Sequence, residues 1–448
     1  MTDGNPDLLE RLKQDDIDFL WVAYHDYGGR ASAKTLPRPS MDSAVRNGVV
    51  FAKANLNMDA NDHQVAGATM LANSGDMMAV PDPRSYTLLP RYPNTALTHV
   101  YLREPDGSVW EGCPRTRLDT IVRKLRDEGF TIQAALEPEF TLLYRSEDDE
   151  LAPINHSRMF SQDGLAKANA FIVDLMTELA AMGINVPQLG KEYGPGQYEL
   201  SLQHGSPMEA VDRYLQFRAT LHDISQMHGM VATLMPKPYA DYAGNSLHVH
   251  LSVWNGDGSK NLTASNEDDI SLSELGMWFM GGLLTHAPAL TAVGSPTVNG
   301  YKRLLPGSWA PANTYWGYGN RSGVIRVPGV GSRRHIEYRS PDNTAQPYLL
   351  LCALLAAGLD GIKRQIDPGP PFAGDVGHLT AQEVELHHLG FLPRTLPEAL
   401  TALEQDELVC AALGPEILKH FLAVKRGELE TYDTIVHDWE RSTYLELH

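Results

Sequence analysis

Charged side chains recur inside segments that otherwise alternate like strands, and this pattern constrains the fold more than any other feature. Residues 131–144 contain Glu137-Pro138-Glu139, and residues 245–252 contain His248 and His250. Side chains two positions apart on a strand point to the same face. Like charges held side by side are costly unless a cation lies between them. The pattern predicts a sheet with one polar face, although an acidic pair can also be a solvated surface and a His-x-His pair can also be buried in a core.

Two further segments extend this set. Glu192 and Glu199 flank the turn Gly194-Pro195-Gly196, and residues 333–339 alternate so that Glu337 and Arg339 share a face. Five carboxylates and a histidine, without a cysteine, favour a hard cation such as Mg²⁺ or Mn²⁺. Arginine side chains, which grip carboxylate and phosphate groups, crowd the same half of the chain. The combination indicates phosphoryl transfer from a nucleotide to an acidic substrate. The arginines are Arg303, Arg321, Arg326, Arg333, Arg334 and Arg339.

The rest of the sequence predicts an α+β protein of two domains. Residues 17–24 and the stretch after the turn at 27–30 predict a β-hairpin in a small β-rich domain of residues 1–105. Residues 106–448 alternate helices and strands, with a strand at 230–235 and a mixed sheet. Helices are predicted at 116–128, 165–182 and 206–228, and capping boxes at Ser206 and Thr395 open helices. Pro138 predicts an edge or an irregular position in its strand, because proline has no N–H.

Composition and charge exclude several classes of function. The chain has 37 basic and 56 acidic residues, a formal net charge of −19, which disfavours a nucleic-acid partner. The longest apolar run, residues 348–359, predicts a buried helix, since a membrane helix needs about 20 such residues. The first 15 residues show no leader pattern, the three cysteines show no metal or disulfide spacing, and P-loop and dinucleotide fingerprints are absent. The expectation is a soluble, cytoplasmic enzyme with small-molecule substrates.

Six motifs follow one another along the chain. They are Glu137-x-Glu139-Phe140, Gly196-Gln197-Tyr198-Glu199, Lys237-Pro238 leading to His248-x-His250-x-Ser252, Asn299-Gly300-Tyr301-Lys302-Arg303-Leu304, Asn320-Arg321-Ser322, and Glu337-Tyr338-Arg339-Ser340-Pro341-Asp342. In this order they resemble the glutamine synthetase family, from about Asp16 to the C-terminus. The resemblance implies an N-terminal β-grasp domain, then a catalytic domain with a curved antiparallel sheet and flanking helices. It also implies active sites between neighbouring subunits of a double hexameric ring.

By that resemblance the protein uses ATP and glutamate with two or more Mg²⁺ or Mn²⁺ ions in each site. One metal would be held by Glu139, Glu192 and Glu199, and the other by Glu137, His248 and Glu337. Arg303 and Arg339 would bind the carboxylates of glutamate, and Gly244 belongs to the loop that meets it. Arg321 and Arg326 would counter charge on the transferring phosphoryl group, whereas His250 and Ser252 would lie toward the nucleotide. Arg303, Arg321 and Glu192 are the predicted catalytic residues.

Departures from the family pattern indicate the class of amine that is used. Ammonia-using members surround ammonium with carboxylates, one from the N-terminal domain and one from a flap; here Ala52 and Trp309 occupy those positions, and Met159 replaces a tyrosine. Apolar bulk in place of charge favours an amine with a carbon tail, at about 0.8 kcal/mol per buried CH₂. The sequence therefore predicts an ATP-dependent ligase that joins the γ-carboxylate of L-glutamate to an alkyl, aryl or similar amine. The alternatives are glutamine synthetase itself and a non-catalytic structural relative.

Overall fold

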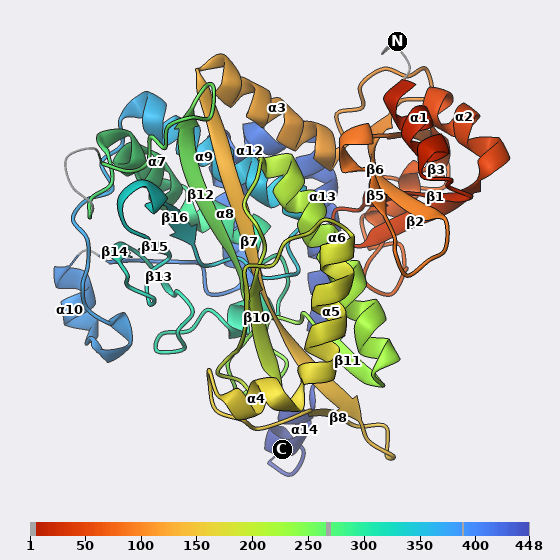
Figure 1. The fold of residues 1–448 in the computed structure, drawn as a ribbon. Coiled ribbons are helices and arrows are strands. Elements are labelled where there is room, and N and C mark those ends of the chain that lie inside the picture. The colour runs from red at the N-terminus through yellow and green to blue at the C-terminus, as the bar shows by residue number, and fades with distance from the viewer. Residues whose placement is uncertain (1–5, 266–269, 388, 448) are drawn as a thin grey trace.

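A computed structural model describes residues 6–265, 270–387 and 389–447, and the strands of these residues form two large β-sheets and one two-stranded ladder. Figure 1 shows their arrangement. The prediction that no leader is present rests partly on residues 1–5, which lie outside the described residues. The first sheet belongs to the N-terminal part of the chain and lies to one side of the larger, central sheet. This arrangement confirms the predicted α+β class with a small N-terminal domain followed by a larger one.

The N-terminal sheet has the strand order β2-β1-β6-β4-β3, with β5 paired to β6. Its first two strands form the predicted antiparallel hairpin, and β1 pairs with β6 in parallel, as a β-grasp arrangement requires. Gly29 in the hairpin turn has φ +77°, a left-handed conformation that favours glycine. The strands are β1 (Phe19–His25), β2 (Ala31–Pro37), β3 (Val49–Ala52), β4 (Asp76–Pro81), β5 (Thr87–Leu88) and β6 (Thr95–Arg103).

The central sheet has the order β14-β15-β16-β12-β7-β10-β9, and β8 and β11 also pair with β7. Its ladders are antiparallel except between β14 and β15, which run parallel. A separate ladder joins β13 (Asn313–Thr314) to β17 (Gly390–Phe391). The strands of the central sheet are β7 (Phe130–Arg145), β8 (Leu151–Pro153), β9 (Gln188–Lys191), β10 (Gln197–Ser201), β11 (Met230–Thr233), β12 (Leu247–Asn255), β14 (Trp316–Tyr318), β15 (Ile325–Val327) and β16 (Ile336–Tyr338).

Strand β7 divides the sheet into a core face and a polar face. Leu136, Pro138 and Phe140 are buried, whereas the alternate residues Glu137 and Glu139 are half-buried on the opposite face. The β7–β10 ladder covers residues 139–141 and ends beside Pro138, which has no N–H to donate. The proline therefore occupies an irregular position, as its lack of a donor predicts, even though β7 is central rather than at an edge.

Helices cover the core face of the central sheet. The buried apolar run 348–359 lies in α9, as predicted, and no helix among the described residues is long and apolar enough to span a bilayer. Helices α7 and α9 approach closely at Gly282 and Gly361, where an added Cβ on either glycine would overlap the other helix. The helices are α1 (Pro6–Gln14), α2 (Arg38–Asn47), α3 (Pro114–Asp127), α4 (Gln162–Lys167), α5 (Asn169–Ala181), α6 (Pro207–Met227), α7 (Glu274–Thr285), α8 (Ala287–Gly294), α9 (Pro347–Arg364), α10 (Ala381–Leu386), α11 (Leu396–Gln405), α12 (Glu407–Leu413), α13 (Pro415–Asp433) and α14 (Asp438–Tyr444).

A buried ion-pair cluster joins the two parts of the chain. The guanidinium of Arg115 on α3 lies 2.7 Å from Asp82, which follows β4, and 2.5 Å from Asp212 on α6. The hydroxyl of Tyr348 on α9 also donates to Asp212, at 2.7 Å. Because Arg115 is only 2% exposed, removing it would leave the Asp212 carboxylate without its arginine partner and Asp82 with Arg84 alone, at 2.9 Å.

Three sequence predictions need correction. Residues 165–182 do not form one helix: α4 ends at Lys167, and α5 begins at Asn169 on the other side of Ala168, so that α4 packs on β9 while α5 packs on α6. Thr395 caps Glu398 N–H, but the Glu398 carboxylate accepts from Arg394 N–H, so only half of that capping box forms. The strand expected over 333–339 is restricted to β16, because residues 331–333 form a 3₁₀ turn. The capping box at Ser206 is confirmed, and the domain boundary at residue 105 stays a prediction.

Candidate active site

The register of the central sheet brings the predicted ligands together on its polar face. Glu137 on β7 lies opposite His248 on β12, and Glu139 lies opposite Glu199 on β10. On the other side of β12, His250 lies opposite Glu337 on β16. Like charges directly opposite one another destabilise a sheet. The Glu139–Glu199 pair is therefore an arrangement that a bound cation would relieve.

His248 lies at the centre of this face with an unused nitrogen atom. Its Nδ1 is 3.7 Å from Glu137 Oε2, 3.7 Å from Glu337 Oε1 and 3.9 Å from Glu199 Oε2. The atom is buried and has no hydrogen-bond partner among the described residues. A buried polar nitrogen without a partner, surrounded by carboxylate oxygens, fits a divalent cation bound by imidazole and carboxylate ligands.

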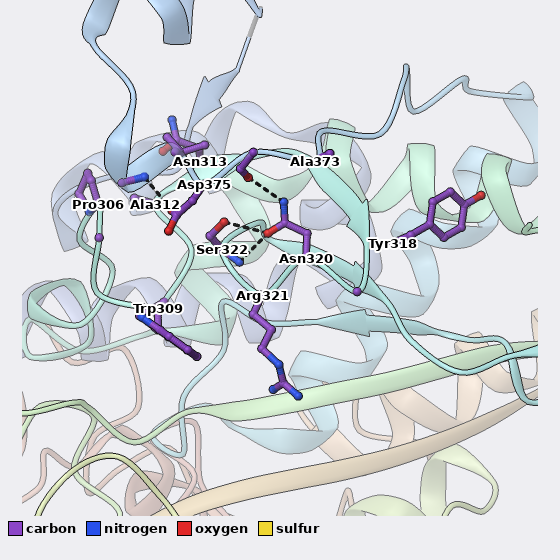
Figure 2. Close-up of a pocket in the computed structure, with 16 residues that line it drawn as sticks. Pro306, Trp309, Ala312, Asn313, Tyr318, Asn320, Arg321, Ser322, Ala373 and Asp375 are labelled. Carbon is purple, nitrogen blue, oxygen red and sulfur yellow. Dashed lines mark hydrogen bonds between the residues drawn. The ribbon is translucent and has the colours of Figure 1, made fainter. Parts of the chain in front are cut away.

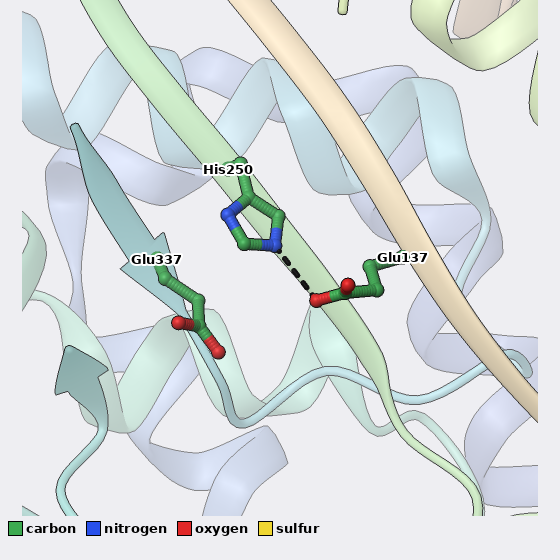
Figure 3. Close-up of side chains that lie close together, drawn as sticks. All are labelled: Glu137, His250 and Glu337. Atoms are coloured by element: carbon green, nitrogen blue, oxygen red, sulfur yellow. Dashed lines mark hydrogen bonds and ion pairs between the residues drawn. The ribbon is translucent and has the colours of Figure 1, made fainter. Parts of the chain in front are cut away.

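Two groups of side chains place their ligand atoms within 4.8 Å of one another: Glu137, Glu199 and His248, and Glu137, His250 and Glu337. Figure 3 shows the second group, in which His250 and Glu337 come from adjacent strands and Glu137 faces them. The structure thus brings four of the six predicted ligands together and adds His250, which the sequence placed toward the nucleotide. Neither group contains Glu139 or Glu192. The assignment of ligands to individual metals stays a prediction.

The pKa values of the carboxylates reflect this crowding. Burial, followed by the charges of Glu137 and other site glutamates, raises the pKa of Glu199 to about 10. Burial and the charge of Glu139 raise the pKa of Glu192 to about 7. Burial opposes ionisation of Glu337 as well, but Arg339 and the neighbouring histidines hold its pKa down to about 2. The cluster therefore retains protons that a metal would displace.

A short chain of hydrogen bonds fixes the orientation of His250. His335 Nδ1 lies 2.8 Å from the carbonyl of Arg333, which can only accept, so this nitrogen donates. His335 Nε2 then accepts from His250 Nδ1 at 3.0 Å, and His250 Nε2 lies 3.0 Å from Glu137 Oε2. Ser201 donates to the other oxygen of Glu137 at 2.6 Å. Sequence reasoning missed Ser201 as a site residue. The signal was present, because Ser201 lies two residues after Glu199 on the same strand and therefore shares its face.

Glu139 is held by donors from two directions. Its Oε2 accepts from the backbone N–H of Ser246 at 2.8 Å and from the side-chain amide of Gln197 at 3.2 Å. The same Gln197 amide donates to the carbonyl of Gly244 at 2.9 Å. The sequence motif named Gln197 without giving it a role. Its amide links a predicted metal ligand to the predicted glutamate loop.

The predicted arginines converge on the same region. Arg326 donates to Glu337 at 2.6 Å, Arg339 pairs with Glu337, and Arg303 donates to the carbonyl of Pro341 at 3.0 Å. The Nε–H groups of all three arginines are buried without a hydrogen-bond partner among the described residues. An added Cβ on Gly244 would lie 2.9 Å from Arg303 Cγ, so glycine there lets the loop lie against this arginine. Unused guanidinium donors beside acidic side chains suit an anionic substrate.

Two cavities open beside these groups and share Arg321. The larger, of about 1110 Å³, is lined by His250, Ser252, Glu192 and Arg326 among others. The smaller, of about 450 Å³, is lined by Trp309, Asn313 and Asp375 among others. Figure 2 shows Trp309 and Arg321 pointing to one side of the smaller cavity, away from Asn313 and Asp375.

The three residues of the predicted amine pocket lie in different parts of the chain. Trp309 is 65% exposed and has φ +60°, a left-handed conformation that is uncommon for a bulky side chain. Ala52 ends β3 in the N-terminal domain, and Met159 lies in the turn before α4. Neither Ala52 nor Met159 is among the described residues that line the two cavities. Within one chain the structure does not assemble this pocket, which the family resemblance expects to form between neighbouring subunits.

Comparison with known proteins gives one consistent result. A family model described as "Glutamine synthetase, catalytic domain" matches residues 111–444. A glutamine synthetase of Halobacterium salinarum is 33% identical, covering 100% of this chain and 97% of its own. A glutamate–methylamine ligase of Methyloversatilis universalis is 34% identical, covering 97% and 98%. A solved structure described as "GmaS/ADP complex-Conformation 1" has a TM-score of 0.87 and 30% identity, covering 98% and 100%.

Proposed function

The chain belongs to the glutamine synthetase family, and on that premise we propose that it is an ATP-dependent glutamate–amine ligase. The family uses ATP and divalent metals, and the acidic and imidazole groups on the polar face fit such ions. The proposed product is a γ-glutamyl amide of an alkyl, aryl or similar amine, formed with ADP and phosphate.

The proposed reaction has two steps. A γ-carboxylate oxygen of glutamate attacks the terminal phosphorus of ATP, and ADP leaves; the amine nitrogen then attacks the acyl carbon, and phosphate leaves. Bound metals would neutralise charge on the phosphoryl group. Arg303 and Arg339 would hold the carboxylates of glutamate, and Arg321 would balance charge at the phosphoryl group from its position between the two cavities. Glu192, which lines the larger cavity, is the proposed acceptor of the proton that the amine loses.

Trp309 is the observation on which the proposed preference for a carbon-bearing amine rests. Its indole lines the cavity that also contains Arg321, at the flap position where the family pattern for ammonia expects a carboxylate. A flat apolar face favours an amine with a carbon tail over bare ammonium. The glutamate–methylamine ligase among the relatives supports this choice.

Glutamine synthesis from ammonia is the second candidate. It is favoured by the number of relatives that carry the name glutamine synthetase, including those of Halobacterium salinarum and Thermus thermophilus. A non-catalytic role is disfavoured, because all six predicted metal ligands are present and four of them gather within the two ligand groups.

A panel of amines tests the proposal. Phosphate release is measured with ATP, glutamate and Mn²⁺, adding ammonium or one of several alkyl and aryl amines at equal concentration. We expect a higher kcat/KM for a carbon-bearing amine than for ammonium. Trp309→Glu combined with Ala52→Asp should shift that ratio toward ammonium. Val173→Glu, which places the same charge on an exposed apolar residue of α5, is the matched control and should leave the ratio unchanged.

A wild-type enzyme that prefers ammonium to every amine in the panel would contradict the amine assignment. It would leave ordinary glutamine synthetase activity as the function of the site.

We also propose a ring oligomer with shared active sites, as the family resemblance implies. The C-terminal segment supports an assembly, because it exposes large apolar side chains at positions 435, 436, 439, 445 and 447. Sedimentation velocity is the test. An active species with the mass of one chain, 49.4 kDa, would contradict this proposal.

A further inference from the structure

A lysine is completely buried beside the predicted metal ligand Glu192. Lys191 is the last residue of β9, and its exposed fraction is 0%. Its ammonium group donates to the backbone carbonyls of Glu192 and Gly194, each at 2.6 Å. No carboxylate among the described residues lies within ion-pair distance of it. The ammonium group also lies 5.9 Å from the centre of the Tyr198 ring. A buried ammonium without a carboxylate partner is unusual, because burial of a charge is costly unless the charge is compensated.

The two carbonyls belong to a turn that is tied to the rest of the site. Glu192 N–H donates to the Gln197 carbonyl at 2.9 Å, and Gly194 N–H donates to the Gln197 side-chain oxygen at 2.7 Å. The Gln197 amide in turn reaches Glu139 and Gly244. Lys191 and Gln197 therefore contact the same turn through different groups. The Lys191 ammonium binds its carbonyls, and Gln197 accepts from its N–H groups.

The aliphatic part of the Lys191 side chain is tightly packed, as its ammonium group is. An added Cβ on Gly164 of α4 would lie only 2.7 Å from Lys191 Cγ, so the helix rests directly on the side chain. The hydroxyl of Tyr198 donates to the carbonyl of Gly164 at 2.6 Å, which keeps α4 in place. The ammonium group consequently has little freedom to leave the two carbonyls.

We propose that Lys191 is a positioning residue that holds the Glu192 turn in its metal-binding conformation. With both carbonyls directed inward to the ammonium group, the Glu192 side chain lines the larger cavity, and its Oε2 accepts from the backbone N–H of Tyr193 in the same turn at 3.1 Å. The proposal rests on the metal role of Glu192 within the proposed function. Groups that orient metal ligands without touching the metal typically change metal affinity by about 10- to 100-fold.

Manganese binding to the whole protein, measured with Mn²⁺ alone by the loss of its free EPR signal, tests this role. Lys191→Met keeps the length of the side chain and removes its donors. We expect it to weaken one class of Mn²⁺ site by at least about tenfold while the other keeps wild-type affinity. Lys425→Met is the matched control: Lys425 is 1% exposed on α13, where it pairs with Glu428 instead of the site, and its loss should leave Mn²⁺ binding unchanged.

Gly164→Ala provides a second perturbation that leaves the lysine in place. Alanine suits a helix better than glycine, so α4 should persist while the new methyl group displaces Lys191. We expect the same Mn²⁺ site to weaken several-fold. Wild-type Mn²⁺ affinity in Lys191→Met would overturn the proposal, and if that variant does not fold, wild-type affinity in Gly164→Ala would do so. The titration contains no amine, so a failure of the amine assignment leaves its result intact.

Discussion

Metal binding should release protons from the carboxylate cluster. Glu199→Gln should lower the number of protons released, because it removes a group that gives up a proton when the metal binds. Glu199 has a pKa of about 10 and is protonated near pH 7, whereas metal ligation requires the carboxylate. Glutamine replaces this neutral acid with a neutral amide of the same shape. The variant should therefore fold and retain the charge of the metal-free site, yet release fewer protons.

The size of the effect follows from two groups. Near neutral pH, Glu199 contributes one proton and Glu192, with its pKa of about 7, contributes about half, which gives about 1.5 protons per chain. Toward pH 6 the total should rise to about 1.9, because Glu192 is then almost fully protonated. Glu199→Gln should lower the total by about one proton. Other groups that lose protons when the metal binds should do so equally in wild type and in Glu199→Gln. Their protons therefore cancel when the two release values are subtracted.

Isothermal titration with Mn²⁺ in two buffers of different ionisation enthalpy measures the number of protons released. Glu147→Gln, which changes an exposed glutamate in a surface turn, is the matched control and should release as many protons as wild type. Equal release from wild type and Glu199→Gln would refute the reasoning, since Glu199 would then already be ionised or would not bind the metal. The raised pKa also predicts that the metal-free protein loses stability as pH rises above the ordinary glutamate value of 4.5.

Three further changes should affect stability rather than chemistry. Burial opposes the charge of His286, but hydrogen bonds to Asp406 and Asp360 raise its pKa. The contribution of His286 to the free energy of unfolding is therefore fully present below pH 6.5 and is lost as pH rises through the raised pKa. His286→Gln should reduce this pH dependence of stability, as measured by urea unfolding at several pH values. Arg115→Met should lower the free energy of unfolding by about 3–5 kcal/mol, because two buried aspartates lose their shared counter-ion, and an unchanged urea midpoint would contradict this. Gly282→Ala should lower the melting temperature by forcing α7 away from α9, at a cost of about 1–3 kcal/mol, whereas a wild-type value in calorimetry would show that the helices separate freely.

The alternation of residues in β7 was sufficient to predict the polar face of the sheet. Glu137 and Glu139 share that face because the strand period is two, a local rule that needs no knowledge of the fold. The register was not predictable in this way. Glu139 and Glu199 are opposite each other because of how β7 pairs with β10, and nothing local in either segment specifies that pairing.

The features that sequence reasoning missed depend on contacts between distant segments. The apolar spacing over residues 165–182 continues through Ala168, and only the packing of α4 on β9 and of α5 on α6 separates the two helices. His250 joins Glu137 and Glu337 because β16 pairs with β12, so its assignment to the nucleotide side described only part of its surroundings. Arg115 looks like an ordinary helical arginine in the sequence, and its partners are 33 and 97 residues away.

The left-handed backbone at Trp309 links the stability of the flap to the shape of the neighbouring cavity. A non-glycine residue in that conformation carries a strain of about 1–2 kcal/mol, which asparagine or glycine would largely avoid. Replacing the indole by either of these residues would thus relax the flap while it reshapes the cavity. At this position, therefore, a change of side chain can raise the stability of the protein while it alters the cavity that the proposed amine would enter.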